Sequence, residues 1–453
     1  MTRRQRGSGG SGGPGRSAGS GRSCGSGRSH GRGTSGQSGR SGRSDFAAAV
    51  LVALFFFSAG ADAQILSHRG FLDGSVVLFP EDAPNDPTQV VGDLLGREEL
   101  FVKPARWLQF AAGVDVRANS HDQVDDSWKP DFGDRGTLRP PVEVRRLTAT
   151  FTRGPLTVDA GKQFIRWGKT DILNPTDRFA PRDFLNVVDT EFIGVTAVRG
   201  VVTAGAETFE GVWVPRFTPS RVPLLDQRWT VVPTSAAGVP LVDAGAAFPD
   251  GSQIGVRWGH MGSGFEYSLS FFDGFNHLPN IDVAVRSTPL RAELTRTYPS
   301  IRTYGGDAAV PTRWFTVKGE AAYFTTSSPA TDEYLLYVLQ LERQTGEWVF
   351  MAGYAGEVVT LRRSTLDFAP DRGLTRSIVG RASYTIGPTR SVAFESAIRQ
   401  NGAGAYGKAE YSQSRGNHWR ATVAGVLIRG DSDDFLGQYR QNSYLKAALR
   451  YSF

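Results

Sequence analysis

The chain contains very little cysteine and only one long apolar run. Cys24 is the single cysteine, so no intramolecular disulfide can form. The apolar run, residues 46 to 60, has 15 residues, whereas a helix that spans a membrane needs about 20. The rest of the chain must therefore either be soluble or cross a membrane as strands.

Catalytic and metal-binding patterns are missing after residue 63. The histidines there are scattered, and no two have the spacing of metal ligands. There is neither a Gly-x-Ser-x-Gly turn nor a Gly-rich phosphate loop. We therefore expect no enzyme, no metal and no cofactor. The histidines in question are His68, His121, His260, His277 and His418.

The basic charge of the chain is confined to its first 63 residues. The whole chain has a formal charge of +6, but this segment holds nine of the 51 Lys and Arg and only two of the 45 Asp and Glu. The remainder has 42 basic against 43 acidic residues, a charge of −1. A near-neutral chain gives no electrostatic reason to bind nucleic acid.

The N-terminal region has the composition of an export signal. Residues 1 to 45 are a Gly-, Ser- and Arg-rich leader that cannot bury apolar area and is expected to be disordered. Residues 46 to 63 combine the short apolar run with the small-x-small cleavage site Ala61-Asp62-Ala63, which is typical of a signal peptide. The Ser-Gly-Arg repeats alone would suggest an RNA-binding tail. A segment ahead of a cleaved signal peptide leaves with it, so residues 64 to 453 form the predicted mature domain.

The last ten residues alternate with period two and finish on an aromatic. Leu445, Ala447, Leu449, Tyr451 and Phe453 fall on one face of a strand, while Lys446 and Arg450 fall on the other. Such a strand suits a wall between lipid and water. The alternative is an edge strand of a soluble sandwich.

This ending resembles the C-terminal strand of Gram-negative outer-membrane proteins. The resemblance implies that Leu449, Tyr451 and Phe453 are the signal read by the barrel assembly machinery.

Eighteen period-two segments, an even number, can be drawn along the chain. Their connections alternate between tight Gly- or Pro-containing turns and mostly longer polar loops. Short turns on one rim and long loops on the other are typical of an outer-membrane barrel, so we predict an all-β, antiparallel, up-and-down transmembrane barrel. The segments are 69–80, 97–103, 106–118, 142–153, 156–168, 193–203, 207–216, 252–261, 264–273, 297–309, 313–326, 334–344, 347–360, 376–387, 389–400, 405–415, 417–429 and 439–453.

Several of these strands separate apolar from charged side chains. A charge on the lipid face at the membrane midplane costs ~2 to 4 kcal/mol, so charges should face the lumen. We therefore expect a wet lumen with both signs of charge, and bulged or displaced walls at 156–168 and 297–309, where the alternation is poor. The predicted lumen-facing residues are Lys318, Glu320, Glu395, Arg399, Lys408, Glu410 and Arg420.

Charged residues, prolines and Trp167 are concentrated in residues 161 to 183, which begin the third long loop. Such a composition favours an ordered loop. It could fold into the pore, where opposed charges form a constriction, or it could only brace the rim. Residues 213 to 221 could pack against it. The constriction candidates are Arg166, Lys169, Asp171, Asp177, Arg178, Arg182 and Asp183.

Short motifs within these two segments are Arg-Trp-Gly-Lys, Asn-Pro-Thr-Asp, Val-Trp-Val-Pro and Phe-Thr-Pro-Ser-Arg. They resemble a group of poorly characterised proteobacterial outer-membrane proteins, loosely associated with alginate-export and porin-type barrels. The resemblance implies an eighteen-stranded channel for solutes or a polysaccharide, and it brings no catalytic residues.

The predicted function is passive or facilitated passage of small hydrophilic solutes through the cell outer membrane. Sixteen to eighteen strands leave an aqueous lumen. The expected partners are outer-membrane lipid and lipopolysaccharide, the barrel assembly machinery and the solutes, with no nucleic acid. The alternative is a non-conducting structural or assembly barrel that partners a lipid or polysaccharide export system.

Overall fold

The computed structural model describes residues 65–232, 238–363 and 372–453. The predicted leader and signal peptide, residues 1 to 63, lie outside this range. Most of the described chain is β-strand, with only a short 3-10 helix, η2 (Gly437–Asn442). Among the described residues, no helix has the length and hydropathy required to cross a membrane.

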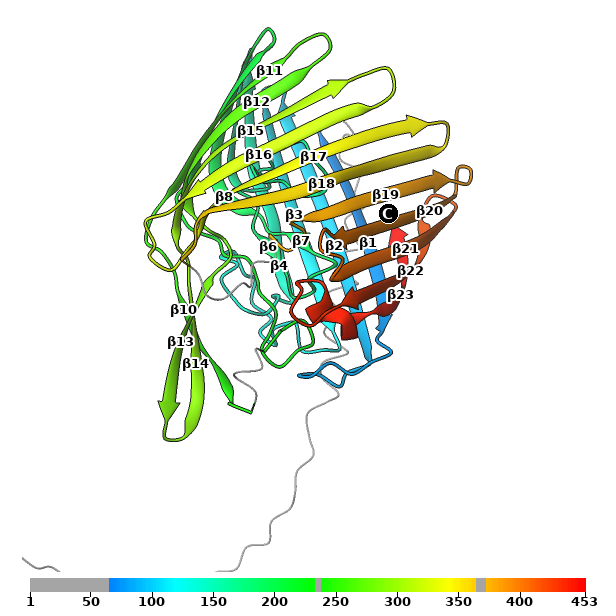
Figure 1. Ribbon diagram of the computed structural model, residues 1–453. Helices are drawn as coiled ribbons and strands as arrows, with labels where there is room; N and C mark the ends of the chain where they lie inside the picture. Colours follow the sequence, from blue (N-terminus) through cyan, green and yellow to red (C-terminus); the bar gives the residue numbers. More distant parts are fainter. Residues whose placement is uncertain (1–64, 233–237, 364–371) are drawn as a thin grey trace, which may run out of the picture. The chain divides into compact units, whose positions relative to one another are not determined.

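Eighteen of the described strands form one closed antiparallel barrel, in which each strand pairs with the next along the wall (Figure 1). The predicted fold class is confirmed. The wall strands are β1 (Leu66–Leu78), β2 (Val90–Ala105), β3 (Leu108–Asn119), β4 (Val142–Arg153), β5 (Leu156–Gln163), β8 (Val195–Ala204), β9 (Glu207–Val214), β11 (Gln253–Met261), β12 (Glu266–Phe275), β15 (Ser300–Pro311), β16 (Thr316–Thr325), β17 (Glu333–Thr345), β18 (Trp348–Leu361), β19 (Ser377–Thr385), β20 (Arg390–Arg399), β21 (Gly404–Arg415), β22 (Trp419–Gly430) and β23 (Tyr444–Ser452).

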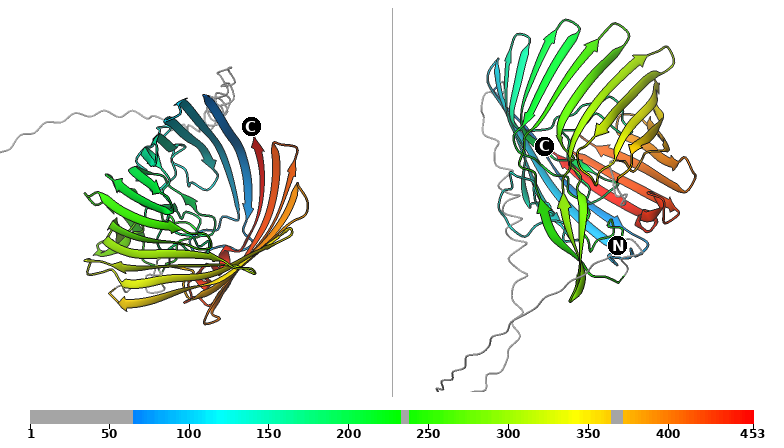
Figure 2. Two further views of the ribbon diagram at one scale, coloured as in Figure 1. Left: turned by 90° about the horizontal axis from the view of Figure 1, so that it is seen from above. Right: turned by 60° about the vertical axis from the view of Figure 1, so that its left-hand side comes forward.

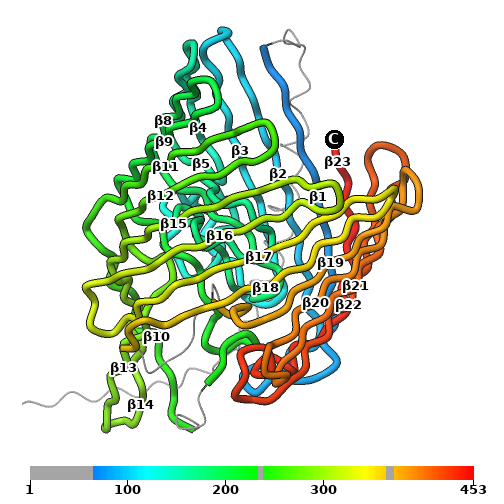
Figure 3. Tube along the Cα trace, turned by 45° about the horizontal axis from the view of Figure 1, so that its top comes forward, coloured from blue at the N-terminus to red at the C-terminus, as the bar shows by residue number. Residues whose placement is uncertain are grey.

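The barrel closes where β23 pairs with β1. Leu445 lies opposite Leu78, and Tyr451 lies opposite Leu72. The last residue extends this ladder, because Phe453 and Gly70 exchange two backbone hydrogen bonds of 3.0 Å. Figure 3 shows the first strand in blue beside the last in red. No edge of the wall is left unpaired.

The loops alternate in length around the barrel, as predicted. The eight turns β2–β3, β4–β5, β8–β9, β11–β12, β15–β16, β17–β18, β19–β20 and β21–β22 have two to four residues. The connections between these hairpins are generally longer and reach 38 residues between β9 and β11. Because neighbouring strands are antiparallel, all the short turns lie on one rim and the other connections lie on the opposite rim.

The outer face of the wall is apolar. On β17, Leu339 and Leu341 are 56% and 41% exposed, while the alternate residues Val338 and Gln340 are 3% and 0% exposed. On β22, Val423 and Leu427 are likewise exposed, whereas Val426 and Ile428 are buried. Alternate residues of a strand point to opposite faces, so a row of large apolar side chains faces outward on each of these strands.

Aromatic side chains mark the rim that carries the short turns. They lie in or directly beside five of these turns, and each is at least 41% exposed. Exposed aromatics at this position are typical of the aromatic girdle at a membrane–water interface. These residues are Trp107, Phe265, Trp314, Trp348 and Trp419.

Two predicted loops contain strands. Residues 217–251 include β10 (Leu241–Ala247), and residues 274–296 include β13 (Asn280–Ser287) and most of β14 (Leu290–Thr297). The three form a separate sheet beyond the wall (Figure 1). Ile281, Val283 and Val285 recur with period two in the sequence. The predicted even number of wall strands was already complete without this segment.

Some predicted boundaries are wrong. β2 begins at Val90 rather than at residue 97, and η2 replaces the first part of the strand predicted at 439–453. β5 ends at Gln163, and the chain then leaves the wall, which explains the poor alternation up to residue 168. Neither β5 nor β15 has a shift in its register. Near β5, the register shifts lie between β2 and β3 and between β3 and β4.

Candidate functional site inside the barrel

The chain between β5 and β8, residues 164 to 194, is the inward loop. Its Glu191 bonds Arg117 on β3 at 3.1 Å, and its Asp189 bonds Lys446 on β23 at 2.9 Å. The same loop also contacts Glu320 on β16. Because these strands lie in separate parts of the wall, the loop must cross the interior. Figure 2 shows irregular segments inside the ring of strands.

Glu320 holds the inward loop against β16. Its carboxylate accepts hydrogen bonds from the backbone N–H of Lys169, Thr170 and Thr176, at 2.9, 3.2 and 3.0 Å, and from both threonine hydroxyls. Gly168 has a φ of +93°, and a Cβ there would lie 2.5 Å from a Glu320 oxygen. Glycine is therefore required where the loop passes this carboxylate.

Asp183 joins the inward loop to two other long loops. Its carboxylate receives two hydrogen bonds from Arg139, at 2.8 and 3.0 Å, and one from Arg221 at 3.3 Å. All three side chains are at least nine-tenths buried. Burial alone would raise the pKa of Asp183, but the two guanidinium groups outweigh it and hold the pKa well below its usual range.

Residues 213 to 221 pack against the inward loop, as predicted. Backbone bonds join Arg182 to Arg221 at 3.0 Å and Phe184 to Arg221 at 2.9 Å, and the Arg182 N–H donates to Ser220 Oγ. Within the loop, β6 (Arg182–Asp183) pairs with β7 (Glu191–Phe192). These bonds fix the backbone on both sides of Arg182.

His277 links the same region to the loop that follows β12. One ring nitrogen lies 2.6 Å from the carbonyl oxygen of Thr218, and the other lies 2.9 Å from that of Arg178. The ring also stacks on Phe217. Three long loops are thus tied together inside the barrel.

The charges of the inward loop pair mostly with partners elsewhere. Arg166 bonds Asp177 within the loop at 2.5 Å. Lys169, in contrast, pairs with Glu266 on β12 at 2.8 Å, and Asp171 pairs with Lys318 on β16 at 3.0 Å. The loop is therefore bridged to the wall, as well as folded on itself. Burial raises the pKa of Asp177 despite the nearby Arg166.

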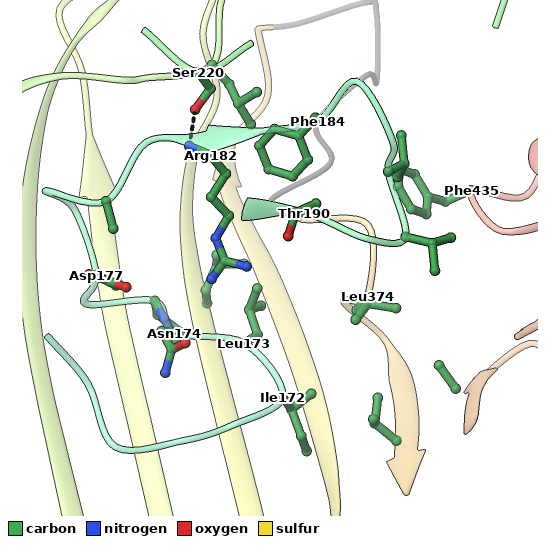
Figure 4. Close-up of a pocket in the computed structure, with 18 of the residues that line it drawn as sticks. Ile172, Leu173, Asn174, Asp177, Arg182, Phe184, Thr190, Ser220, Leu374 and Phe435 are labelled. Carbon is green, nitrogen blue, oxygen red and sulfur yellow. Dashed lines mark hydrogen bonds between the residues drawn. The ribbon is translucent and has the colours of Figure 1, made fainter. Parts of the chain in front are cut away.

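Arg178 and Arg182 line a cavity of about 270 Å³ between the inward loop and the wall. The Arg182 guanidinium lies 4.3 Å from the ring of Phe192, and that of Arg178 lies 4.9 Å from the ring of Phe324. Figure 4 shows Arg182 extending toward Leu173, with Leu374 and Phe435 across the cavity. One side of the space is therefore polar and the other apolar. The apolar side also includes Val379, Ala397 and Leu436.

Four of the seven strand charges expected to face the lumen contact inner segments directly. Lys318 and Glu320 bond the inward loop, and Lys408 lies 3.3 Å from Asp189 of the same loop. Arg399 contacts a different inner segment, with a 2.9 Å bond to Asp434 beside η2.

The remaining three strand charges make fewer contacts. Glu395 lines the cavity and lies opposite Lys408 in the β20–β21 register. Glu410 lies 3.9 Å from Lys408. Arg420 lies opposite Arg450 on β23.

The sequence pattern did not predict that three arginines on β2, β3 and β4 form a cluster. Arg97 bonds Asp115 at 2.6 Å, and Arg97, Arg117 and Arg145 all lie within 3.5 Å of Glu191. Arg145 sits at the bulge between β3 and β4, where it has no partner in the β3 register. A bulge re-aims a side chain in this way. Sequence alternation alone cannot locate it.

The interior is not wet throughout, contrary to the prediction. Trp167 and Phe179 of the inward loop pack edge to face at 5.1 Å, and Phe179 packs on Phe272 of β12 at 5.0 Å. They belong to a buried apolar cluster with inward side chains of β8, β9, β12, β15, β16 and β17. The inward loop covers the apolar side chains that these strands point into the barrel. The alternation within a strand cannot predict that a distant loop covers them.

Within the described residues, no group of three or more His, Cys, Asp or Glu side chains could hold a metal ion.

The comparisons with known proteins concern the fold. No protein-family model and no curated protein matches the sequence. A BenF-like porin from Pseudomonas fluorescens Pf-5 is similar in structure, with a TM-score of 0.50 and 10% identity over 86% of this chain and 98% of that chain. Pseudomonas aeruginosa OpdQ has a TM-score of 0.49 and 8% sequence identity, over 86% of this chain and 98% of that chain. Acinetobacter baumannii OccAB4 has a TM-score of 0.49 and 10% sequence identity, over 87% of this chain and 100% of that chain. At such identities the BenF-like porin supports a shared barrel fold alone.

Proposed function

We propose that this chain is a porin-like channel of the cell outer membrane, through which small hydrophilic solutes pass passively or by facilitated diffusion. The apolar outer face and the aromatic rim at the short turns support insertion in a membrane. The barrel shared with a BenF-like porin is in keeping with this function. We place the rim with the short turns on the periplasmic side and the rim with the long loops on the extracellular side, as in other outer-membrane barrels.

The inward loop is the observation that carries the proposal. It crosses the lumen, is bridged to the wall by charged side chains, and borders the cavity lined by Arg178 and Arg182. A loop held in this position narrows a pore and exposes passing solutes to fixed charges. We assign the constriction to the charged residues of this loop and the surrounding lumen charge to the inward residues of β16, β20, β21 and β22.

The same proposal covers assembly. Leu449, Tyr451 and Phe453 end the strand that closes the barrel, and Leu449 is 51% exposed on the outer face. We infer that they serve as the signal for the barrel assembly machinery, and that lipid and lipopolysaccharide cover the outer wall.

A second candidate function is a non-conducting barrel that supports a lipid or polysaccharide export system. The observation in its favour is the apolar cluster in which the inward loop packs. A densely packed interior suits a scaffold as well as a narrow channel.

Liposome swelling separates the two functions. Purified barrels in liposomes should admit small neutral and charged solutes at rates that fall as solute size rises. Liposomes with heat-unfolded protein provide the control. Swelling no faster than this control, from barrels verified as folded, would favour the scaffold and reject the channel.

A further inference from the structure

The separate sheet of β10, β13 and β14 leaves one regular strand edge unpaired among the described residues. β14 is the middle strand, paired with β10 on one side and β13 on the other. β10 is irregular, with a register shift between Asp243 and Ala246 and a positive φ at Gly245. Such irregularities protect an edge against pairing. β13 pairs with β14 in an unbroken register and has neither a register shift nor a positive φ.

The free edge of β13 is exposed and has two different faces. Residues 282 to 287 are all exposed. Val283 and Val285, 50% and 68% exposed, share one face, whereas Asp282 and Arg286 share the other. Arg286 also bonds Glu293 on β14 at 2.9 Å, which holds its guanidinium on that face.

We propose that two copies of this chain pair through β13, antiparallel and centred on Ala284, to form a continuous six-stranded sheet. In this register Asp282 lies opposite Arg286 of the partner subunit, and Arg286 lies opposite Asp282 of the partner subunit. Val283 and Val285 of the two copies meet on the other face. The strand is thus complementary to itself under a two-fold axis, as an isologous interface requires.

Other pairings lose this complementarity. Parallel, in-register pairing puts Asp282 against Asp282 of the partner subunit, and like charges opposite each other are destabilising. An antiparallel shift by one residue brings the valines onto the charged face. A shift by two residues separates the opposite charges. The β13 sequence therefore favours one register, and the small number of paired residues indicates a weak dimer that covalent capture can reveal.

A disulfide test measures the register directly. In a Cys24→Ser background, Ala284→Cys should form a disulfide-linked dimer of the full chain in detergent and in membranes. Opposed residues of an antiparallel pair lie about 4.5 to 5.5 Å apart at Cα, within reach of a disulfide. Ser287→Cys is the matched control. Its two copies would lie six residues out of register, about 20 Å apart, so it should not link to itself. It should link to Ile281→Cys when the two variants are mixed.

Charge exchange tests the complementarity. In the Ala284→Cys background, Asp282→Arg alone or Arg286→Asp alone puts like charges opposite each other and should slow dimer capture about tenfold. The double variant, with both charges exchanged, should restore the original rate. Barrel folding, followed by heat-modifiable migration on gels, should be unchanged because the sheet lies outside the wall.

Two results would overturn the proposal. One is that folded Ala284→Cys protein forms no disulfide-linked dimer. The same result is expected if the β13 edge binds a partner other than a second copy of this chain. The other is equal capture of Ala284→Cys and Ser287→Cys homodimers, which would indicate random collision. Single charge variants that link as fast as the parent would remove the proposed register.

Discussion

Asp183 shows how a single carboxylate can organise the interior. Arg139, Arg221 and Asp183 come from three different loops and meet in a buried site. Removing one member of a buried ion pair leaves the opposite charge without compensation, which costs about 3 to 5 kcal/mol. The geometry of the inward loop should therefore depend on this one residue.

We expect Asp183→Asn to lower the free energy of unfolding by about 3 to 5 kcal/mol at pH 7. The measurement is the temperature at which the folded barrel loses its heat-modifiable migration. Because the pKa of Asp183 is lowered in the folded state, its contribution is fully present above the ordinary value of 3.8 and is lost only as the pH falls toward the folded-state pKa. The difference in stability between the variant and the parent should therefore begin to shrink below pH 4 and should close only as the pH approaches the folded-state pKa.

The exposed Asp433 provides the matched control, since Asp433→Asn should leave this temperature unchanged at all pH values. A stable Asp183→Asn barrel at pH 7 would mean that the three loops are held by other contacts.

Arg182 tests the assignment of the constriction. Arg182→Gln removes a positive charge from the wall of the cavity, where fields are weakly screened. We expect the reversal potential in a salt gradient to shift toward cation selectivity. Arg291→Gln, on the separate sheet, should not shift it. If both variants keep the parent value with folded barrels, the inward loop only braces the barrel.

At the element scale, period-two alternation together with the bounding turn residues predicted every wall strand, because lipid and lumen impose opposite demands on neighbouring residues. The course of a loop that is fixed by contacts distant in the sequence was harder to predict. The sequence identified the inward loop as ordered and charged, but its bonds to Glu320 and Lys318 span about 150 residues. The bulge at Arg145 and the apolar packing of Trp167 left no periodic signal.

The closing strand leads to a prediction about assembly. Phe453 bonds Gly70 on β1 and ends the outward row of β23. Deleting Phe453 should reduce the amount of folded protein in the outer membrane several-fold and leave export to the periplasm intact. Fractionation with heat-modifiable migration measures both. Normal assembly of the shortened chain would argue against an assembly signal at this end.

The orientation of the hairpins can be tested by labelling. In a Cys24→Ser background, Asp433→Cys in a long connection should react with an impermeant thiol reagent on intact cells. Glu347→Cys, in the short β17–β18 turn, should react only after the outer membrane is permeabilised. Glu347 is preferable to Gly346, whose φ of +55° favours glycine. Surface labelling at Glu347 would reverse the proposed orientation.

At the scale of the whole molecule, a membrane-spanning wall encloses an inner loop that we propose sets the width of the passage. Glu320 is the link between them, because its carboxylate holds the loop through five hydrogen bonds. Glu320→Ala leaves three N–H groups without this acceptor, two of them buried, so the loop should detach from β16 while the strand pairing of the wall persists.

Single-channel conductance in planar bilayers tests this account most directly. The parent barrel should give discrete current steps, and Glu320→Ala should give larger or noisier steps because the passage is wider. Glu347→Ala, an exposed carboxylate in a short turn, should behave like the parent. Folded parent and Glu320→Ala barrels that both remain silent would contradict the channel, and equal steps from the two would contradict the role of the inward loop.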